Sequence, residues 1–164
     1  METKPVSNRM YSLLVLYDMH TKFLPKVTEG FSEKDAQNRL DTKANHVAWL
    51  AGSLVQQRFE LAKSFGVDAT SAANELFKDH KGIQDDVNYP PLSGFIKDWG
   101  IISPRLREAL MNLSDEKLDS MFTMPEMSMS YFEFISFCIY REANCIGQIA
   151  LWRRLLSYPA MNYM

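Results

Sequence analysis

The chain has 164 residues, of which 46% are hydrophobic and 12% aromatic, enough for a single compact domain over residues 1–164 that buries roughly two thirds of its unfolded surface. The formal net charge is −2, from 18 basic and 20 acidic residues, so the chain lacks the basic excess that neutralises a phosphate backbone, and we expect no nucleic-acid partner. The apolar run at residues 11–17 is too short for a signal sequence or a membrane span, which predicts a cytoplasmic protein with no membrane partner.

Apolar residues recur with helical spacing in four long segments, and no sustained period-two pattern bounded by hairpin turns is visible. The first helix is expected over residues 8–27, with an end or a kink near Pro25. The second is expected to begin at residues 42–45, where short polar side chains can cap it, and to stop at Gly66. The predicted buried stripe of the first helix consists of Met10, Leu13, Leu14, Leu16, Tyr17, His20 and Leu24.

The long connection at residues 67–89 is expected to hold at most one short helix, over residues 71–78. The third helix is expected over residues 92–113, with Pro104 predicting a kink or a break near Ile102. A further short helix is expected to start at Ser114, the last long helix spans residues 128–157, and the tail 158–164 is expected to pack loosely or fray. The sequence therefore predicts an all-α fold, a four-helix bundle with a long crossover between its second and third helices.

The segment 141–149 reads Arg-Glu-Ala-Asn-Cys-Ile-Gly-Gln-Ile. It resembles the last helix of DinB/YfiT-like proteins, in which the pattern His-Glu-x-x-His-x-Gly-Gln supplies two metal-binding histidines one helical turn apart. Arg141 and Cys145 stand in the two histidine positions, whereas Glu142 and Gln148 keep the family residues. The resemblance extends over nearly the whole chain and implies the DinB fold.

The second expected helix resembles the other signature of that family, in which a tryptophan is followed by a small-residue turn and then by the third metal-binding histidine. Trp49 and Gly52 match the family, and Ser53 stands in the histidine position. Serine is a poor ligand, one cysteine is a single good ligand, and a guanidinium repels a metal ion. We therefore expect no metal and no other cofactor, although relatives that keep the histidines are known or proposed to be metal-dependent thiol transferases.

Arg141, Cys145 and Cys138 fall on one side of the last helix, among aromatic residues. Arg141 either reaches the helix edge or pairs with a buried carboxylate, or it lines a cleft and grips an anionic group. Cys145 is either a small core residue or a nucleophile whose thiolate is favoured by Arg141. The two cysteines lie seven residues apart on one helix, about 10 Å, which is beyond disulfide reach.

Glu142 is expected to pair with a cation on a neighbouring helix, such as Arg58. Gly52 and Gly147 are interpreted as points of close helix approach, and Arg153 and Arg154 as favourable charges at a helix C-terminus. A rebuilt metal site from His20, His46 and Cys145 is a minor alternative.

The function favoured by these residues is a metal-free DinB-like bundle that binds a small molecule or a protein partner in the cleft of Ser53, Arg141 and Cys145, supported by Trp49, Glu142 and Gln148. A homodimer is expected because relatives commonly dimerise and apolar side chains are abundant. The alternatives are a thiol-dependent transferase that uses Cys145 and a structural or regulatory remnant without activity. A cleft filled by Trp49, Phe134 and Trp152 would favour the remnant.

Overall fold

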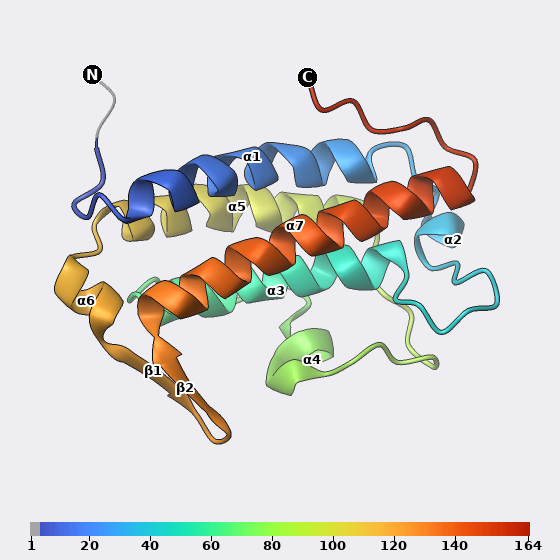
Figure 1. The fold of residues 1–164 in the computed structure, drawn as a ribbon. Coiled ribbons are helices and arrows are strands. Elements are labelled where there is room, and N and C mark those ends of the chain that lie inside the picture. The colour runs from blue at the N-terminus through green and yellow to red at the C-terminus, as the bar shows by residue number, and fades with distance from the viewer. Residues whose placement is uncertain (1–3) are drawn as a thin grey trace.

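The computed structural model describes residues 4–164, and within that range the chain is mostly helical, as the sequence predicted. Four long helices run side by side, α1 (Met10–Thr28), α3 (Val47–Ser64), α5 (Leu92–Met111) and α7 (Tyr131–Leu155) (Figure 1). The connections hold α2 (Glu33–Ala36), α4 (Asn74–Phe77), the 3-10 turn η1 (Lys78–His80) and α6 (Asp115–Asp119). Among these helices, none is long and apolar enough to cross a membrane.

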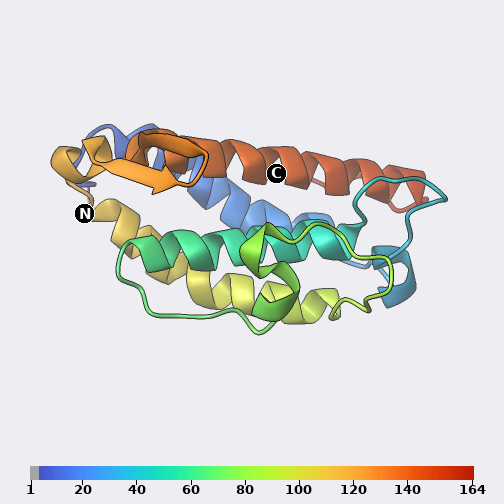
Figure 2. The same cartoon turned by 90° about the horizontal axis from the view of Figure 1, so that it is seen from below.

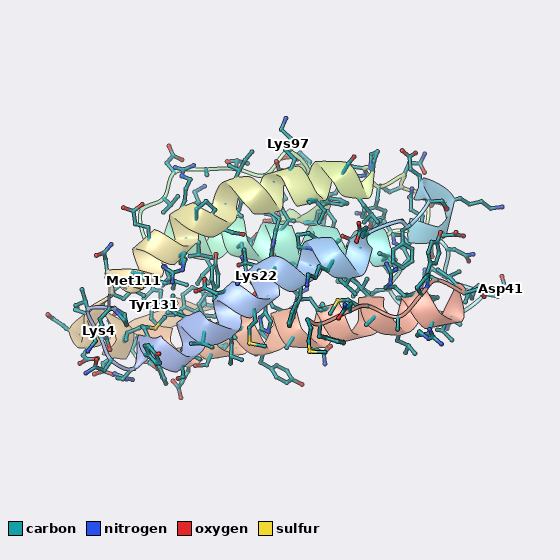
Figure 3. All side chains as sticks on the ribbon, turned by 90° about the horizontal axis from the view of Figure 1, so that it is seen from above. Lys4, Lys22, Asp41, Lys97, Met111 and Tyr131 are labelled. Atoms are coloured by element: carbon teal, nitrogen blue, oxygen red, sulfur yellow. The ribbon has the colours of Figure 1, made fainter. Side chains whose placement is uncertain are left out.

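The core lies between the four long helices. α1 packs mainly against α5 and α7, and α3 packs against the same two helices. Each long helix contributes side chains that are less than 2% exposed, for example Tyr17, Leu54, Trp99 and Ile135. Figure 3 shows charged side chains such as Lys22 and Lys97 on the outside of α1 and α5. The arrangement follows from one apolar stripe per helix turned toward a shared interior.

Residues 65–91 carry the chain from one end of α3 back to the start of α5, so these two helices run in the same direction (Figures 1 and 2). Gly66 ends α3 with a φ of 82°, and the backbone N–H of Val67 donates to the carbonyl of Ala62 at 3.0 Å. Such a left-handed residue after a helix favours glycine, as the sequence predicted. The connection then places α4 and η1 beside the middle of α3.

The third helix does not break near Ile102, which was one of the two outcomes that Pro104 predicted. α5 continues from Leu92 to Met111 across Pro104, and Ile102 is fully buried within it. Pro104 is exposed, and the hydroxyl of Ser103 donates to the carbonyl of Trp99 at 2.6 Å in the preceding turn. Tertiary packing of the apolar stripe on both sides of the proline outweighs the loss of one backbone hydrogen bond.

The sequence also missed a β-hairpin. Strands β1 (Met121–Met124) and β2 (Met127–Ser130) pair antiparallel before α7. The last helix therefore begins at Tyr131 rather than at residue 128. Ser130 caps it, because its side chain accepts from the backbone N–H of Glu133, whose carboxylate in turn accepts from the backbone N–H of Ser130.

Two smaller expectations need correction. Leu16, assigned to the buried stripe of α1, is 41% exposed. The C-terminal tail is attached rather than loose, because buried Arg153 donates from Nε to the carbonyl of Pro159 at 2.9 Å, and the Tyr158 hydroxyl donates to Asp35 at 2.6 Å. Met161 is also buried. Arg153 thus ties the tail to the end of the helix.

Candidate functional site

The middle of α3 faces the middle of α7, and there Ser53 meets Arg141. With Cys145, these are the three slot residues, which stand in the expected positions of the metal-binding histidines. Arg141 Nη2 donates to Ser53 Oγ at 3.1 Å, and Nη1 donates to Gln57 Oε1 at 3.1 Å. Ser53 Oγ itself donates to the carbonyl of Leu50 at 2.9 Å. Gln57 follows Ser53 by one helical turn, and this spacing is the signal that could have identified it from the sequence.

Among residues 4–164, both hydrogen-bond partners of Arg141 are neutral. No carboxylate in residues 4–164 lies within ion-pair distance of its guanidinium, so pairing with a buried carboxylate, one of the alternatives that the sequence left open for Arg141, is excluded. The side chain is partly buried, and the two hydrogen bonds use two of the five N–H groups of a guanidinium. An arginine in this state keeps donors available for a further acceptor.

A cavity of about 210 Å³ lies beside Arg141, between α3, α7 and the α4–η1 segment. Aromatic side chains form much of its wall, and polar or charged groups interrupt that wall. The aromatic residues are Trp49, Phe77, Phe134 and Phe137. The others are Ser53, Gln56, Gln57, Glu60, His80, Lys81, Cys138 and Arg141. Phe137, one turn before Arg141 on α7, and the residues of the α4–η1 segment were not predicted as site residues.

Trp49, predicted as a supporting residue, does line the cavity. Its indole Nε1 is buried and has no hydrogen-bond acceptor within residues 4–164. A buried N–H without a partner is costly, at about 1–3 kcal/mol, and such groups are rare in folded proteins. Trp49 thus both lines the cavity and holds a buried donor that the described residues do not satisfy.

The cavity rim at η1 is conformationally strained. Asp79 and His80 have φ values of 59° and 56°, both in the left-handed region. Residues other than glycine adopt this region at a cost, although Asp and His tolerate it better than most. Such strain gathers where a segment is held in place by its surroundings, often at a binding site.

The predicted roles of Cys145 and Gln148 differ from their observed positions. Cys145 is 5% exposed and is not part of the cavity wall, whereas Cys138 is. Gln148 is exposed, and its Nε2 donates to Asn144 Oδ1 at 2.6 Å on the same helix. The third slot residue and one supporting residue thus lie outside the cavity.

Burial also determines the chemistry of the two thiols. It raises the pKa of Cys145, and the opposing effect of Arg141 does not cancel it. Burial raises the pKa of Cys138 to about 12, with a further contribution from Glu142. A thiol whose pKa is raised holds little reactive thiolate at neutral pH.

Glu142 points away from the cavity into the core, where it forms the predicted pair with Arg58. Arg58 Nε donates to Oε1 at 2.7 Å and Nη2 to Oε2 at 2.8 Å, a bidentate arrangement. His20 Nδ1 lies 3.2 Å from the same Oε2. Burial favours the neutral acid, but Arg58 and His20 outweigh it and hold the pKa of Glu142 below its usual value.

The remaining polar contacts of Arg58 make it a structural residue. Its guanidinium lies between the rings of Tyr17 and Trp99, with Cζ 3.8 and 3.5 Å from their centroids. Nη1 donates to Thr21 Oγ1 and Ser103 Oγ, both at 2.7 Å. This cluster joins all four long helices through one fully buried cation.

The residues present do not fit a metal ion. Ser53 accepts from the guanidinium of Arg141, which places a fixed positive charge beside it that would repel a metal ion. His20 contacts Glu142, and His46 caps α3 by accepting from the N–H of Trp49 at 3.1 Å, so the rebuilt histidine site is not formed. Burial lowers the pKa of His46 to about 4. Across residues 4–164, no group of three His, Cys, Asp or Glu side chains is placed to hold a metal.

The two glycines of the signatures differ. A Cβ on Gly52 would lie 2.3 Å from Phe77 Cζ and 2.8 Å from Phe95 Cε1, so a close approach does require glycine there. A Cβ on Gly147 would meet nothing within 4 Å, and the interpretation of Gly147 as a close approach is wrong. Gly52 is what admits the Phe77 ring that lines the cavity.

The fold and site together define a helical protein with a small, aromatic-walled cavity beside a cation. No protein-family model matches the chain, and no curated protein is similar to it in sequence.

Proposed function

We propose that this protein is a metal-free, DinB-like four-helix bundle with a long crossover connection, and that it binds a small organic anion in the cavity beside Arg141. The observation that carries this proposal is the partly buried guanidinium of Arg141, which lacks a carboxylate partner and borders the cavity. The DinB resemblance of the two signature helices supports the location, because Ser53 and Arg141 stand in the family's site positions.

The contacts of Arg141 favour an anion over a neutral ligand. Ser53 and Gln57 hold the guanidinium in place but neutralise no charge. A carboxylate can accept two parallel hydrogen bonds from one guanidinium, and charged hydrogen bonds contribute about 1.5–3 kcal/mol each. Lys81 and Glu60 also line the cavity with opposite charges, so Arg141 gives the lining its net positive charge.

The size and wall of the cavity limit the rest of the ligand. A volume of about 210 Å³ lies below the roughly 300–1,000 Å³ of drug-sized sites. The rings of Trp49 and Phe77 are 6.4 Å apart between centroids and tilted by 46°, and both line the cavity, where a flat apolar group can pack against aromatic surface. A small aromatic carboxylate fits both requirements, and benzoate is a suitable probe.

The test uses the three tryptophan indole N–H signals in a two-dimensional NMR spectrum. Benzoate is expected to shift the signal of Trp49, which lines the cavity, and to leave those of Trp99 and Trp152 in place, because these donate to the carbonyls of Thr21 and Asn45. Benzamide, which has the same shape without the charge, should bind about 10–100-fold more weakly.

The matched variants are Arg141→Gln and Arg154→Gln. Arg154 lies on the same helix but is exposed, so its variant removes one charge without touching the cavity. We expect Arg141→Gln to lose the benzoate response and Arg154→Gln to keep it. Equal responses to benzoate and benzamide, or an unchanged response in Arg141→Gln, would contradict the proposal.

We also propose that the protein is a cytoplasmic homodimer. Exposed apolar side chains on α1 and α7 support the dimer, namely Tyr11, Val15, Met19, Phe137, Tyr140 and Leu151. Sedimentation at micromolar concentration should give twice the 18.9 kDa of one chain. A single species at 18.9 kDa would count against the dimer, and cell fractionation tests the location.

A further inference from the structure

The β-hairpin is unusually rich in methionine. Four of the ten methionines of the chain fall within residues 121–129, at positions 121, 124, 127 and 129. The two strands are joined only by Pro125 and Glu126. The thioether sulfurs are thus concentrated in a short element outside the helical core (Figure 1).

The strand register divides these methionines between two faces. Met124 is directly opposite Met127, and Phe122 is opposite Met129. Successive side chains of a strand alternate between faces, and directly opposite residues share one. Met124, Met127 and Met129 therefore lie on one face with Phe122, whereas Met121 lies on the other.

A hydrogen bond confirms this assignment of faces. Thr123 Oγ1 and Ser128 Oγ are 3.3 Å apart, so these two residues share the face opposite to that of the three methionines. On the methionine face, the Phe122 ring is stacked on Phe134 of α7 with 3.9 Å between centroids. This stacking turns the methionine face toward α7 and holds Phe122 against that helix.

Packing does not account for the three methionines. None of them belongs to the buried core or to the partly buried apolar side chains that pack against it. Met127 is 42% exposed and Met124 and Met129 are half-buried, and Met has a lower strand preference than the β-branched and aromatic residues. Three flexible apolar side chains on a surface hairpin need another explanation than burial.

We propose that Met124, Met127 and Met129 form a binding site for a soft monovalent cation, copper(I). Met124 and Met127 are directly opposite, which places their Cβ atoms about 4.5–5.5 Å apart, and Met129 is the diagonal neighbour of Met124, at about 7–8 Å. The unbranched methionine side chain has three rotatable bonds with which to bring its sulfur to a shared point. Thioethers are soft ligands that select copper(I) over the harder divalent ions. The exposed Glu126 in the turn adds a negative charge near the site.

Thioether ligands give this site a property that thiol or imidazole sites lack. Cysteine and histidine must lose a proton to bind a metal, so their affinity falls in acid. A methionine sulfur carries no proton to lose. Binding by the hairpin is therefore independent of pH between 5 and 7, which separates it from binding by Cys138 or Cys145.

The experiment titrates the whole protein with silver(I), which has the charge and filled d shell of copper(I) and is stable in air. The protein carries methionine labelled with ¹³C in the methyl group, and NMR follows every methyl. We expect the methyls of Met124, Met127 and Met129 to shift together and to saturate at one equivalent, at both pH 5 and pH 7. The methyl of Met10, which is fully buried, reports that the fold is unchanged.

The variant that tests the site replaces all three methionines by leucine, a change that conserves volume. Met121→Leu is the matched control on the other face of the same hairpin. The triple variant is expected to lose the one-equivalent binding and Met121→Leu to retain it. Retained binding in the triple variant, a shift confined to Met121, or no methyl shift at all would overturn the proposal.

Discussion

Two arginines reach across the interface between α3 and α7, Arg58 from α3 and Arg141 from α7, and they differ in burial and in the charge of their partners. Arg58 of α3 is fully buried, holds Glu142 with two charged hydrogen bonds and lies between two aromatic rings. Arg141 of α7 is partly buried and has two neutral partners beside a cavity. The charge of Arg58 is neutralised by a carboxylate of the protein itself, whereas the charge of Arg141 is left for a ligand to neutralise.

Both residues are arginine, so their surroundings alone distinguish a structural cation from a candidate ligand-binding cation. Breaking a buried ion pair by removing one partner costs about 3–5 kcal/mol, because the other charge stays buried and uncompensated. Removing a partly exposed cation from neutral partners leaves no charge behind. The predictions below test each side of that contrast, beginning with the largest effect.

Arg58→Met is expected to lower the free energy of unfolding by about 3–5 kcal/mol, since it leaves Glu142 buried beside His20 alone. Arg141→Met is expected to lower it by less than about 1 kcal/mol, as for other partly exposed polar contacts. Urea unfolding followed by circular dichroism measures both values. If Arg141→Met were as costly as Arg58→Met, Arg141 would be a structural residue and the contrast would disappear.

The Arg58–Glu142 pair also predicts how stability depends on acid. The pKa of Glu142 in the folded protein is held below its ordinary value of 4.5, so its contribution is fully present above pH 4.5 and is lost as the pH falls through the folded pKa. The stability difference between the wild type and Glu142→Gln should therefore shrink below pH 4.5. Urea unfolding at a series of pH values tests this, and a difference that grew in acid would refute it.

Alanine substitutions of Gly52 and Gly147 are expected to change the free energy of unfolding in opposite directions. Gly52→Ala places a Cβ against the rings of Phe77 and Phe95 and is expected to cost about 1–3 kcal/mol, while pushing Phe77 into the cavity and weakening benzoate binding. Gly147→Ala meets open space inside a helix and is expected to add about 0.5–1 kcal/mol. Thermal unfolding measures both, and a stabilising Gly52→Ala would show that the cavity wall is loosely packed.

The smallest effect is expected for the thiols. Because burial raises the pKa of both cysteines, iodoacetamide should label both Cys138 and Cys145 slowly in the native protein. Mass spectrometry of timed digests gives the two rates. Rapid labelling of Cys145 alone would instead support the thiol-dependent transferase that the sequence left open.

Local signals predicted the elements whose ends depend on neighbouring residues. Gly66 marks the end of α3 because its left-handed backbone costs glycine nothing, and Ser114 caps α6 by accepting from the N–H of Lys117. The hairpin was missed because each strand has only four residues, and six of the eight are methionine or serine, which carry little strand preference. Its two-residue loop, Pro125-Glu126, also lacks the usual hairpin glycine.

The same limits apply to the site. The sequence, through the resemblance of its two signature helices, assigned Ser53 and Arg141 to one site, where they share a hydrogen bond, and it named Arg58 as a partner for Glu142. It could not exclude Cys145 from the cavity, because a helical wheel gives the direction of a side chain and not the neighbour that covers it. It could not find Phe77 or Lys81, which reach the cavity only because the long connection folds back over α3.

The sequence by itself determined that this protein is mostly helical and approximately where its long helices lie. It did so because apolar periodicity, caps and residue chemistry act over a few neighbouring positions. Only the tertiary structure decided that one arginine is neutralised and another is left with neutral partners, and which methionines share a face. Those outcomes depend on groups distant in the chain that packing brings within hydrogen-bond reach, and no local pattern encodes such distances.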